Sequence, residues 1–143
     1  MNSNAGQKDA VAAICRAGLD AIRVSMISAR EDTYNAYHRP SGFGLPDVRQ
    51  SIKYAVARGV YTSLNLLVFP GLTDRAEEVA AILNLVRDTG INQIQLRNLN
   101  IDPDLLMDHL PAGGGKIIGI PGMIDSLRSE PGLTVGNFSR PVR

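Results

Sequence analysis

The run SLNLLVFPGLTDRAEEV, residues 63–79, holds the two patterns that decide the fold of this chain. Its first half alternates apolar and polar side chains, which predicts a strand within Val60–Phe69. Its second half passes through a Pro-Gly turn to Asp74 and Glu77, whose spacing predicts a capping box at the start of a helix over Asp74–Thr89. A strand that leads directly into a helix is the building unit of parallel α/β proteins.

The same unit occurs three times along the chain, each time as a helix-like stretch that ends at a glycine and is followed by a strand-like stretch. The glycines are Gly18, Gly59 and Gly90, and each stands where a helix end calls for a left-handed residue. The predicted helices are Asp9–Ala17, Pro46–Arg58 and Asp74–Thr89. The predicted strands are Asp20–Ser28, Val60–Phe69 and Asn92–Asn100. Helices that alternate with short strands predict an α/β fold with a parallel sheet or barrel.

The repeat ends at Asn100. We expect residues 101–143 to form a loop with a short helical turn, a short helix over Pro121–Ser129 and a tail that adds a strand. Residues 1–143 are therefore interpreted as one domain, with helix/strand repeats over 1–100 and a C-terminal loop, short helix and tail over 101–143.

Charge and composition exclude several partners. Lys and Arg total 15 and Asp and Glu total 14, which gives no electrostatic case for nucleic acid or an anionic membrane. No apolar run approaches the roughly 18 residues of a transmembrane helix. The single cysteine, Cys15, allows no internal disulfide and fits a reducing compartment, so we expect a cytoplasmic protein.

Each predicted strand carries polar side chains on one face, which are Arg23 and Ser25, Ser63 and Asn65, and Gln95 and Arg97. Polar groups on a packed sheet are costly unless that face lines a polar cavity, such as a barrel interior open to a ligand. A sheet with one wetted face would satisfy them equally well, and the pattern alone does not separate these two interpretations.

The sequence does not contain the motifs of several other chemistries. Gly115-Lys116 lacks the rest of a phosphate loop, and two histidines with one cysteine make a poor metal site. No arrangement typical of nucleophilic or paired-carboxylate catalysis occurs. The sequence therefore offers no catalytic residue and no metal ligand.

Three stretches, taken in order, resemble a known family. They are GLDAIRVSMIS (18–28), TYNAYHRPSGFG (33–44), and SLNLLVFPGLTDRAEEV (63–79) continued by INQIQLRNLNIDPDL (91–105). Together they resemble the second half of the radical S-adenosylmethionine (SAM) superfamily barrel, in the branch of molybdenum-cofactor synthesis proteins and pyruvate-formate-lyase activases. The resemblance implies half of a parallel (β/α) partial TIM barrel, with about three to four strands alternating with helices.

The resemblance also implies contacts to SAM. Ser25 matches a serine with which family members contact SAM, and Ser28 would share the polar role because Ile27 replaces the usual acid. Arg39, within Tyr37-His38-Arg39-Pro40, resembles the arginine that meets the SAM carboxylate.

Further positions follow from the same resemblance. Val68 and Phe69 match the segment that packs around adenine. Asn65, Gln95 and Arg97 would line the cavity and face SAM or substrate.

One departure from the family is decisive. The family binds its [4Fe–4S] cluster through Cys-x-x-x-Cys-x-x-Cys, and Cys15 alone cannot ligate such a cluster. We therefore expect the C-terminal part of a longer enzyme, in which SAM and the cluster belong to the full-length protein and neither binds this part. Its partner would be the missing N-terminal half of the same chain, the part alone would be inactive, and an exposed sheet edge would permit self-association.

Two alternatives remain open. The chain could be a stand-alone, non-catalytic α/β module that binds a small ligand or a protein on its polar strand face. An aldolase-type half-barrel is a second enzymatic alternative. It would need a lysine or a metal ligand at a strand end, and none of Lys8, Lys53 and Lys116 lies there.

Overall fold

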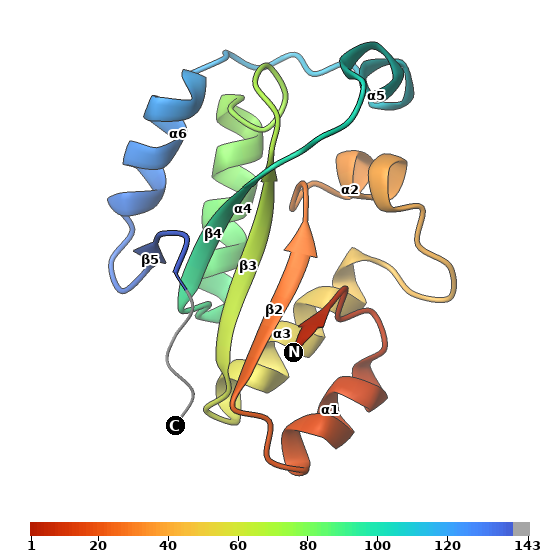
Figure 1. The fold of residues 1–143 in the computed structure, drawn as a ribbon, viewed down its shortest axis with the longest axis vertical. Coiled ribbons are helices and arrows are strands. Elements are labelled where there is room, and N and C mark those ends of the chain that lie inside the picture. Colours follow the sequence, from red (N-terminus) through yellow and green to blue (C-terminus); the bar gives the residue numbers. More distant parts are fainter. Residues whose placement is uncertain (139–143) are drawn as a thin grey trace.

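The computed structural model describes residues 1–138 and contains one parallel five-stranded sheet (Figure 1). The strands lie side by side in the order in which they occur in the sequence, and every neighbouring pair is parallel. They are β1 (Asn2–Ser3), β2 (Ala21–Met26), β3 (Tyr61–Val68), β4 (Gln93–Asn98) and β5 (Thr134–Val135). This sequential order is that of a partial α/β barrel, so the predicted fold class is confirmed.

Helices connect each strand to the next. They are α1 (Lys8–Arg16), α2 (Glu31–His38), α3 (Leu45–Ala57), α4 (Ala76–Thr89), α5 (Pro103–His109) and α6 (Gly119–Arg128). Helix α3 contacts α1 and α4, and α4 contacts α6, so these four helices form one layer. Helices α3 and α4 lie behind the strands in Figure 1, whereas α2 and α5 lie near the carboxyl ends of the strands.

The three glycines that punctuate the sequence have the backbone conformation expected of them. Gly18, Gly59 and Gly90 have φ angles of 98°, 75° and 72°, all in the left-handed region. Each ends a helix and turns the chain toward the next strand, because glycine has no Cβ to clash there. These turns explain why the three predicted strands agree with β2, β3 and β4.

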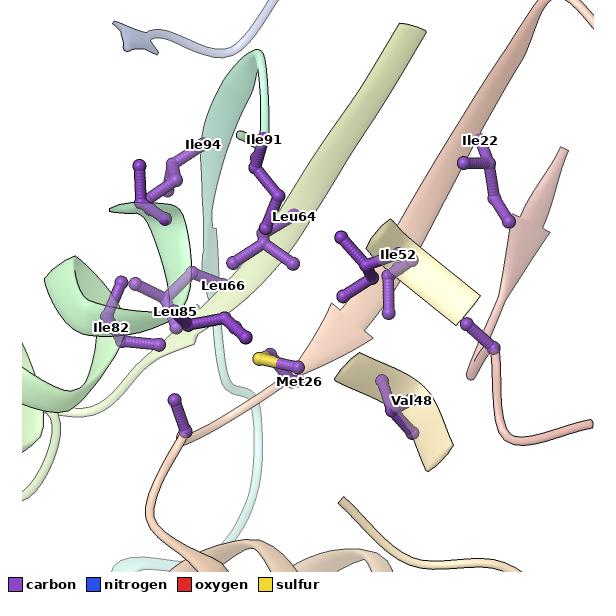
Figure 2. Packing of buried hydrophobic residues seen from close by; sticks show 14 of the residues in the cluster. Ile22, Met26, Val48, Ile52, Leu64, Leu66, Ile82, Leu85, Ile91 and Ile94 are labelled. Carbon is purple, nitrogen blue, oxygen red and sulfur yellow. The ribbon is translucent and has the colours of Figure 1, made fainter. Parts of the chain in front are cut away.

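The core lies between the apolar face of the sheet and the helix layer. Met26, Leu64 and Leu66 are at most 1% exposed. In Figure 2 the side chains of α3 and α4, among them Ile52 and Leu85, converge on those of β2 and β3. Burying each such side chain contributes roughly 1.5–3 kcal/mol, so this interface holds the sheet to the helices.

A second, smaller apolar cluster caps the carboxyl ends of the strands. Its buried members are Ile27, Leu72, Leu106 and Leu110. Phe69, the residue after β3, packs against them, and so does Leu99, the residue after β4. The cluster anchors α5 over the end of the sheet at which α/β barrels bind their ligands.

The predicted capping box at Asp74 and Glu77 is wrong. Helix α4 begins at Ala76 and its N-cap is Arg75, which makes no side-chain capping bond. The Asp74 carboxylate instead accepts a hydrogen bond from the Gly71 N–H over 2.6 Å, and the Glu77 carboxylate accepts one from the Gly115 N–H over 3.0 Å. Both acids therefore hold loops that the local spacing could not reveal.

The C-terminal third contains more regular structure than expected. The predicted helical turn is the seven-residue helix α5, and the predicted last helix is α6. The tail adds β5, and residues 139–143 of the predicted tail lie outside the described residues.

Candidate ligand-binding face of the sheet

Three of the predicted site residues form one row across the sheet. Ser25 of β2 pairs with Asn65 of β3, and Asn65 pairs with Gln95 of β4. Paired residues of neighbouring parallel strands point to the same face. The next row toward the amino ends contains Arg23, Ser63 and Gln93, and we call the face formed by these six residues the polar face. It is opposite to the face that packs on the helix layer.

Asn65 carries an unpaired group at the centre of this face. Its Oδ1 atom is buried and accepts no hydrogen bond from any described residue. A buried amide oxygen without a donor costs about 1–3 kcal/mol, so native proteins seldom leave one unpaired without a ligand or water. Ser25 next to it is only half-buried. This side of the polar face can therefore offer an acceptor and a hydroxyl to a polar ligand.

Gln93 and Gln95 are bonded to the protein's own C-terminal segment, residues 136–138. The Gln93 amide Nε2 donates to the carbonyl oxygens of Gly136 and Phe138 over 2.9 and 3.0 Å. The Gln95 Nε2 donates to the same Phe138 oxygen over 2.8 Å. Both glutamines are only 1% exposed, so this segment covers the β4 side of the polar face.

Arg97 lies beyond the row and is exposed. Its guanidinium donates a hydrogen bond to Gln95 Oε1 over 2.9 Å. Both ends of the Gln95 amide therefore have a protein partner, so Gln95 contributes to the face as a fixed group.

Ser28 lies away from the row. It is fully buried, and its hydroxyl donates a hydrogen bond to the carboxylate of Glu78 and accepts one from the Arg30 N–H over 2.8 Å. Thr33 donates to the same carboxylate over 2.8 Å. These contacts tie α4 to the connection between β2 and α2, so protein groups already occupy the Ser28 hydroxyl.

Val68 and Phe69 are half-buried at the end of β3. Val68 packs against the main core, whereas Phe69 packs in the small cluster at the carboxyl ends. The structure therefore does not bring these two side chains into the row with Ser25 and Asn65.

Arg39 lies outside the row as well. It is the C-cap of α2, with a left-handed backbone (φ 45°, ψ 55°), and its side chain is exposed. It lines a cavity of about 400 Å³ between α2 and α5, together with Tyr37, Leu105 and His109. Sequence reasoning missed this cavity, because the α5 residues that build it lie in a stretch expected to be mainly loop.

The cysteine content does not fit an iron–sulfur cluster. Cys15, the only cysteine of the chain, is 7% exposed on α1. Within residues 1–138 no three His, Cys, Asp or Glu side chains gather as metal ligands would. The described helices also include none with the length and apolarity needed to cross a membrane.

Comparison with known proteins gives a match at the level of fold. Neither a protein-family model nor a curated protein sequence matches the chain. Among solved structures, the chain is similar to a radical SAM methyltransferase from Sphaerobacter thermophilus, with a TM-score of 0.63 and 16% sequence identity. The match covers 98% of this chain and 40% of the methyltransferase, so the chain has the fold of a part of that enzyme.

Proposed function

We propose that this chain is the C-terminal part of a radical SAM enzyme and that its polar face positions SAM. The observation that carries this proposal is the unpaired Oδ1 of Asn65, which lies between Ser25 and Gln95. The fold likeness to a part of a radical SAM methyltransferase supports it.

The residues of the polar face suit the hydroxyl and amino groups of an adenosyl ligand. The Asn65 oxygen accepts a hydrogen bond from a ribose hydroxyl or from the adenine amino group, and the Ser25 hydroxyl can donate or accept. Phe69 would add apolar contact to adenine at the end of β3, and Arg97 would add a cation near the row. Val68 is left out of this proposal because it packs against the main core on the opposite face of the sheet. Ser28 and Arg39 are not part of this proposal. Ser28 has protein partners, and Arg39 lies between α2 and α5.

The ligands of an iron–sulfur cluster must come from another segment, because three thiolates are needed and this chain supplies Cys15 alone. We propose that this segment is the N-terminal half of the same polypeptide and that it pairs along the β1 edge. This chain alone then has no activity in SAM cleavage. Incubation with iron, sulfide and reductant, followed by sustained formation of 5′-deoxyadenosine, would overturn this point.

The sequence leads us to expect no stable complex between SAM and this part alone, so the binding proposal is tested by a measurement that detects weak contact. The chain is titrated with SAM up to millimolar concentration and the amide signals are followed by NMR. We expect shifts centred on Ser25 and Asn65. The Asn65→Leu variant should weaken binding by about tenfold, the loss expected for one buried hydrogen bond. The matched control is Asn84→Leu, at an exposed position on α4, which should bind like the parent chain.

Two results would overturn the binding proposal. The first is a SAM titration in which the amide signals of the polar face do not shift. The second is equal affinity of the Asn65→Leu and Asn84→Leu variants for SAM. Either result would favour the alternative of a stand-alone, non-catalytic α/β module that binds another small ligand or a protein.

A further inference from the structure

The cavity between α2 and α5 has the dimensions of a small-molecule site. Its volume is about 400 Å³, within the range of roughly 300–1,000 Å³ that ligand pockets occupy. Ala36 and Tyr37 line it from α2, and Leu105 and Leu106 line it from α5. None of the six residues of the polar face lines it, so a ligand in this cavity would bind independently of the proposed SAM site.

The walls of this cavity call for an apolar occupant. Leu106 is buried in the cluster at the carboxyl ends of the strands, which gives the cavity a fixed apolar floor. Leu105 leaves 55% of its surface exposed, although large apolar side chains on a helix usually pack inward. An apolar ligand between these leucines and Tyr37 would remove that surface from water.

Basic groups border the same cavity. The Arg39 guanidinium makes no ion pair or hydrogen bond with any other described residue, whereas Arg30, Arg49 and Arg87 each pair with a carboxylate. His109 lies on the opposite wall, and its Nδ1 is hydrogen bonded to the Leu105 carbonyl oxygen over 2.8 Å. The described lining contains no carboxylate, so the charge at this cavity favours an anion.

We propose that the cavity between α2 and α5 binds an apolar carboxylate, a molecule with an aliphatic or aromatic body and one carboxylate group. The body packs against Leu105, Leu106 and Tyr37, and the carboxylate pairs with Arg39. A planar guanidinium suits this role because it donates two parallel hydrogen bonds to the two carboxylate oxygens.

Octanoate and octanol are a matched pair of probes, because they share the chain length and differ in the charged group. We expect octanoate to shift the amide signals of Tyr37, Leu105 and Leu106 and to bind at least about tenfold more tightly than octanol, as a charge-assisted bond implies. Isothermal titration gives the two dissociation constants.

Arg39→Asn removes the charge and keeps a residue that tolerates the left-handed backbone at this position. It should weaken octanoate binding by about tenfold and leave octanol binding unchanged. The control, Arg58→Asn, changes an exposed arginine at the end of α3 and should bind both probes like the parent chain. Ala36→Phe fills the cavity and should abolish binding of both probes, with folding checked by urea unfolding.

Three outcomes contradict this proposal. Octanoate and octanol could bind equally, Arg39→Asn could bind octanoate like the parent chain, or a second copy of the chain could cover the leucines. The last outcome would show as amide shifts at Leu105 that depend on protein concentration and that octanoate does not reverse.

Discussion

The backbone N–H of Ile27 donates a hydrogen bond to Nε2 of His38 over 3.3 Å, so a side chain of α2 binds the backbone directly after β2. Tyr34 stacks on the same imidazole with ring centroids 4.4 Å apart. Nε2 accepts a hydrogen bond only when it carries no proton. Burial lowers the pKa of His38 from 6.5 to about 4, which keeps this ring neutral at physiological pH.

This pKa predicts a loss of stability in mild acid. Because the folded state has the lower pKa, the unfolded chain binds the proton first as the pH falls below 6.5. The contribution of neutral His38 to the free energy of unfolding is complete above pH 6.5 and is lost toward pH 4, at up to about 1.4 kcal/mol per pH unit. Urea unfolding at several pH values measures it. His38→Gln supplies an acceptor that does not titrate, so its slope should be smaller, and an equal slope would contradict the prediction.

The buried carboxylate of Glu78 predicts a second effect on stability. It is 3% exposed and accepts hydrogen bonds from the hydroxyls of Ser28 and Thr33. Glu78→Ala leaves both hydroxyls buried without this acceptor and should lower the free energy of unfolding by about 2–3 kcal/mol.

Two comparisons sharpen the Glu78 measurement. Glu78→Gln keeps an oxygen acceptor of the same length and should recover a large part of the loss. Glu31→Ala changes an exposed glutamate of α2 and should stay within about 0.5 kcal/mol of the parent chain. If Glu78→Ala unfolds at the same urea concentration as Glu31→Ala, the hydrogen bonds from Ser28 and Thr33 to Glu78 do not hold α4 in place.

Glu78 also indicates where sequence reasoning stops. The strands and the glycine-ended helices could be predicted because their signals are local, with an alternation of period two and a left-handed glycine after each helix. The partners of Glu78 lie 45 and 50 residues away, at Thr33 and Ser28. A pattern within one segment carries no information about such a contact, which is why the sequence alone predicts a ligand contact for Ser28 and not its bond to Glu78.

The polar face was predictable in part for the same reason. Alternation along each strand places Ser25, Asn65 and Gln95 on one face, and the parallel register aligns them in one row. The segment over Gln95 was not predictable, because residues 136–138 carry no periodic signal. Helix α2 was missed since its buried side chains include Thr33 and Tyr34, which make a weak apolar stripe.

Gly6 supports a prediction about tight packing. A Cβ atom at Gly6 would lie 2.4 Å from Cδ2 of the Phe43 ring, closer than real Cβ atoms approach any neighbour. Gly6→Ala therefore forces the ring out of place and should destabilise the fold by about 1–3 kcal/mol. The matched control is Gly114→Ala, because a Cβ there meets no atom within 4 Å. Thermal unfolding compares the two variants, and equal midpoints would show that the Phe43 ring shifts freely.

The C-terminal segment over the polar face gives the last prediction. Residues 136–138 are bonded to β4 through the amides of Gln93 and Gln95 and through the Asn137 Oδ1, which accepts from the Leu96 N–H over 2.9 Å. Gln93→Leu with Gln95→Leu removes three of the donor contacts to this segment while it keeps two side chains of similar size. The segment should then separate from the face.

Hydrogen exchange measures this separation. The Gly136 N–H, bonded to the Ile94 carbonyl oxygen over 3.1 Å, should exchange about tenfold faster in the double variant, as one or more lost hydrogen bonds imply. The Val60 N–H, bonded to the Ala55 carbonyl oxygen over 3.0 Å just before β3, should keep its protection, because the substitutions lie in β4 and leave this contact intact. Unchanged exchange at Gly136 would contradict the prediction, because it would mean that the β4–β5 pairing and the Asn137 contact hold the segment without the glutamines.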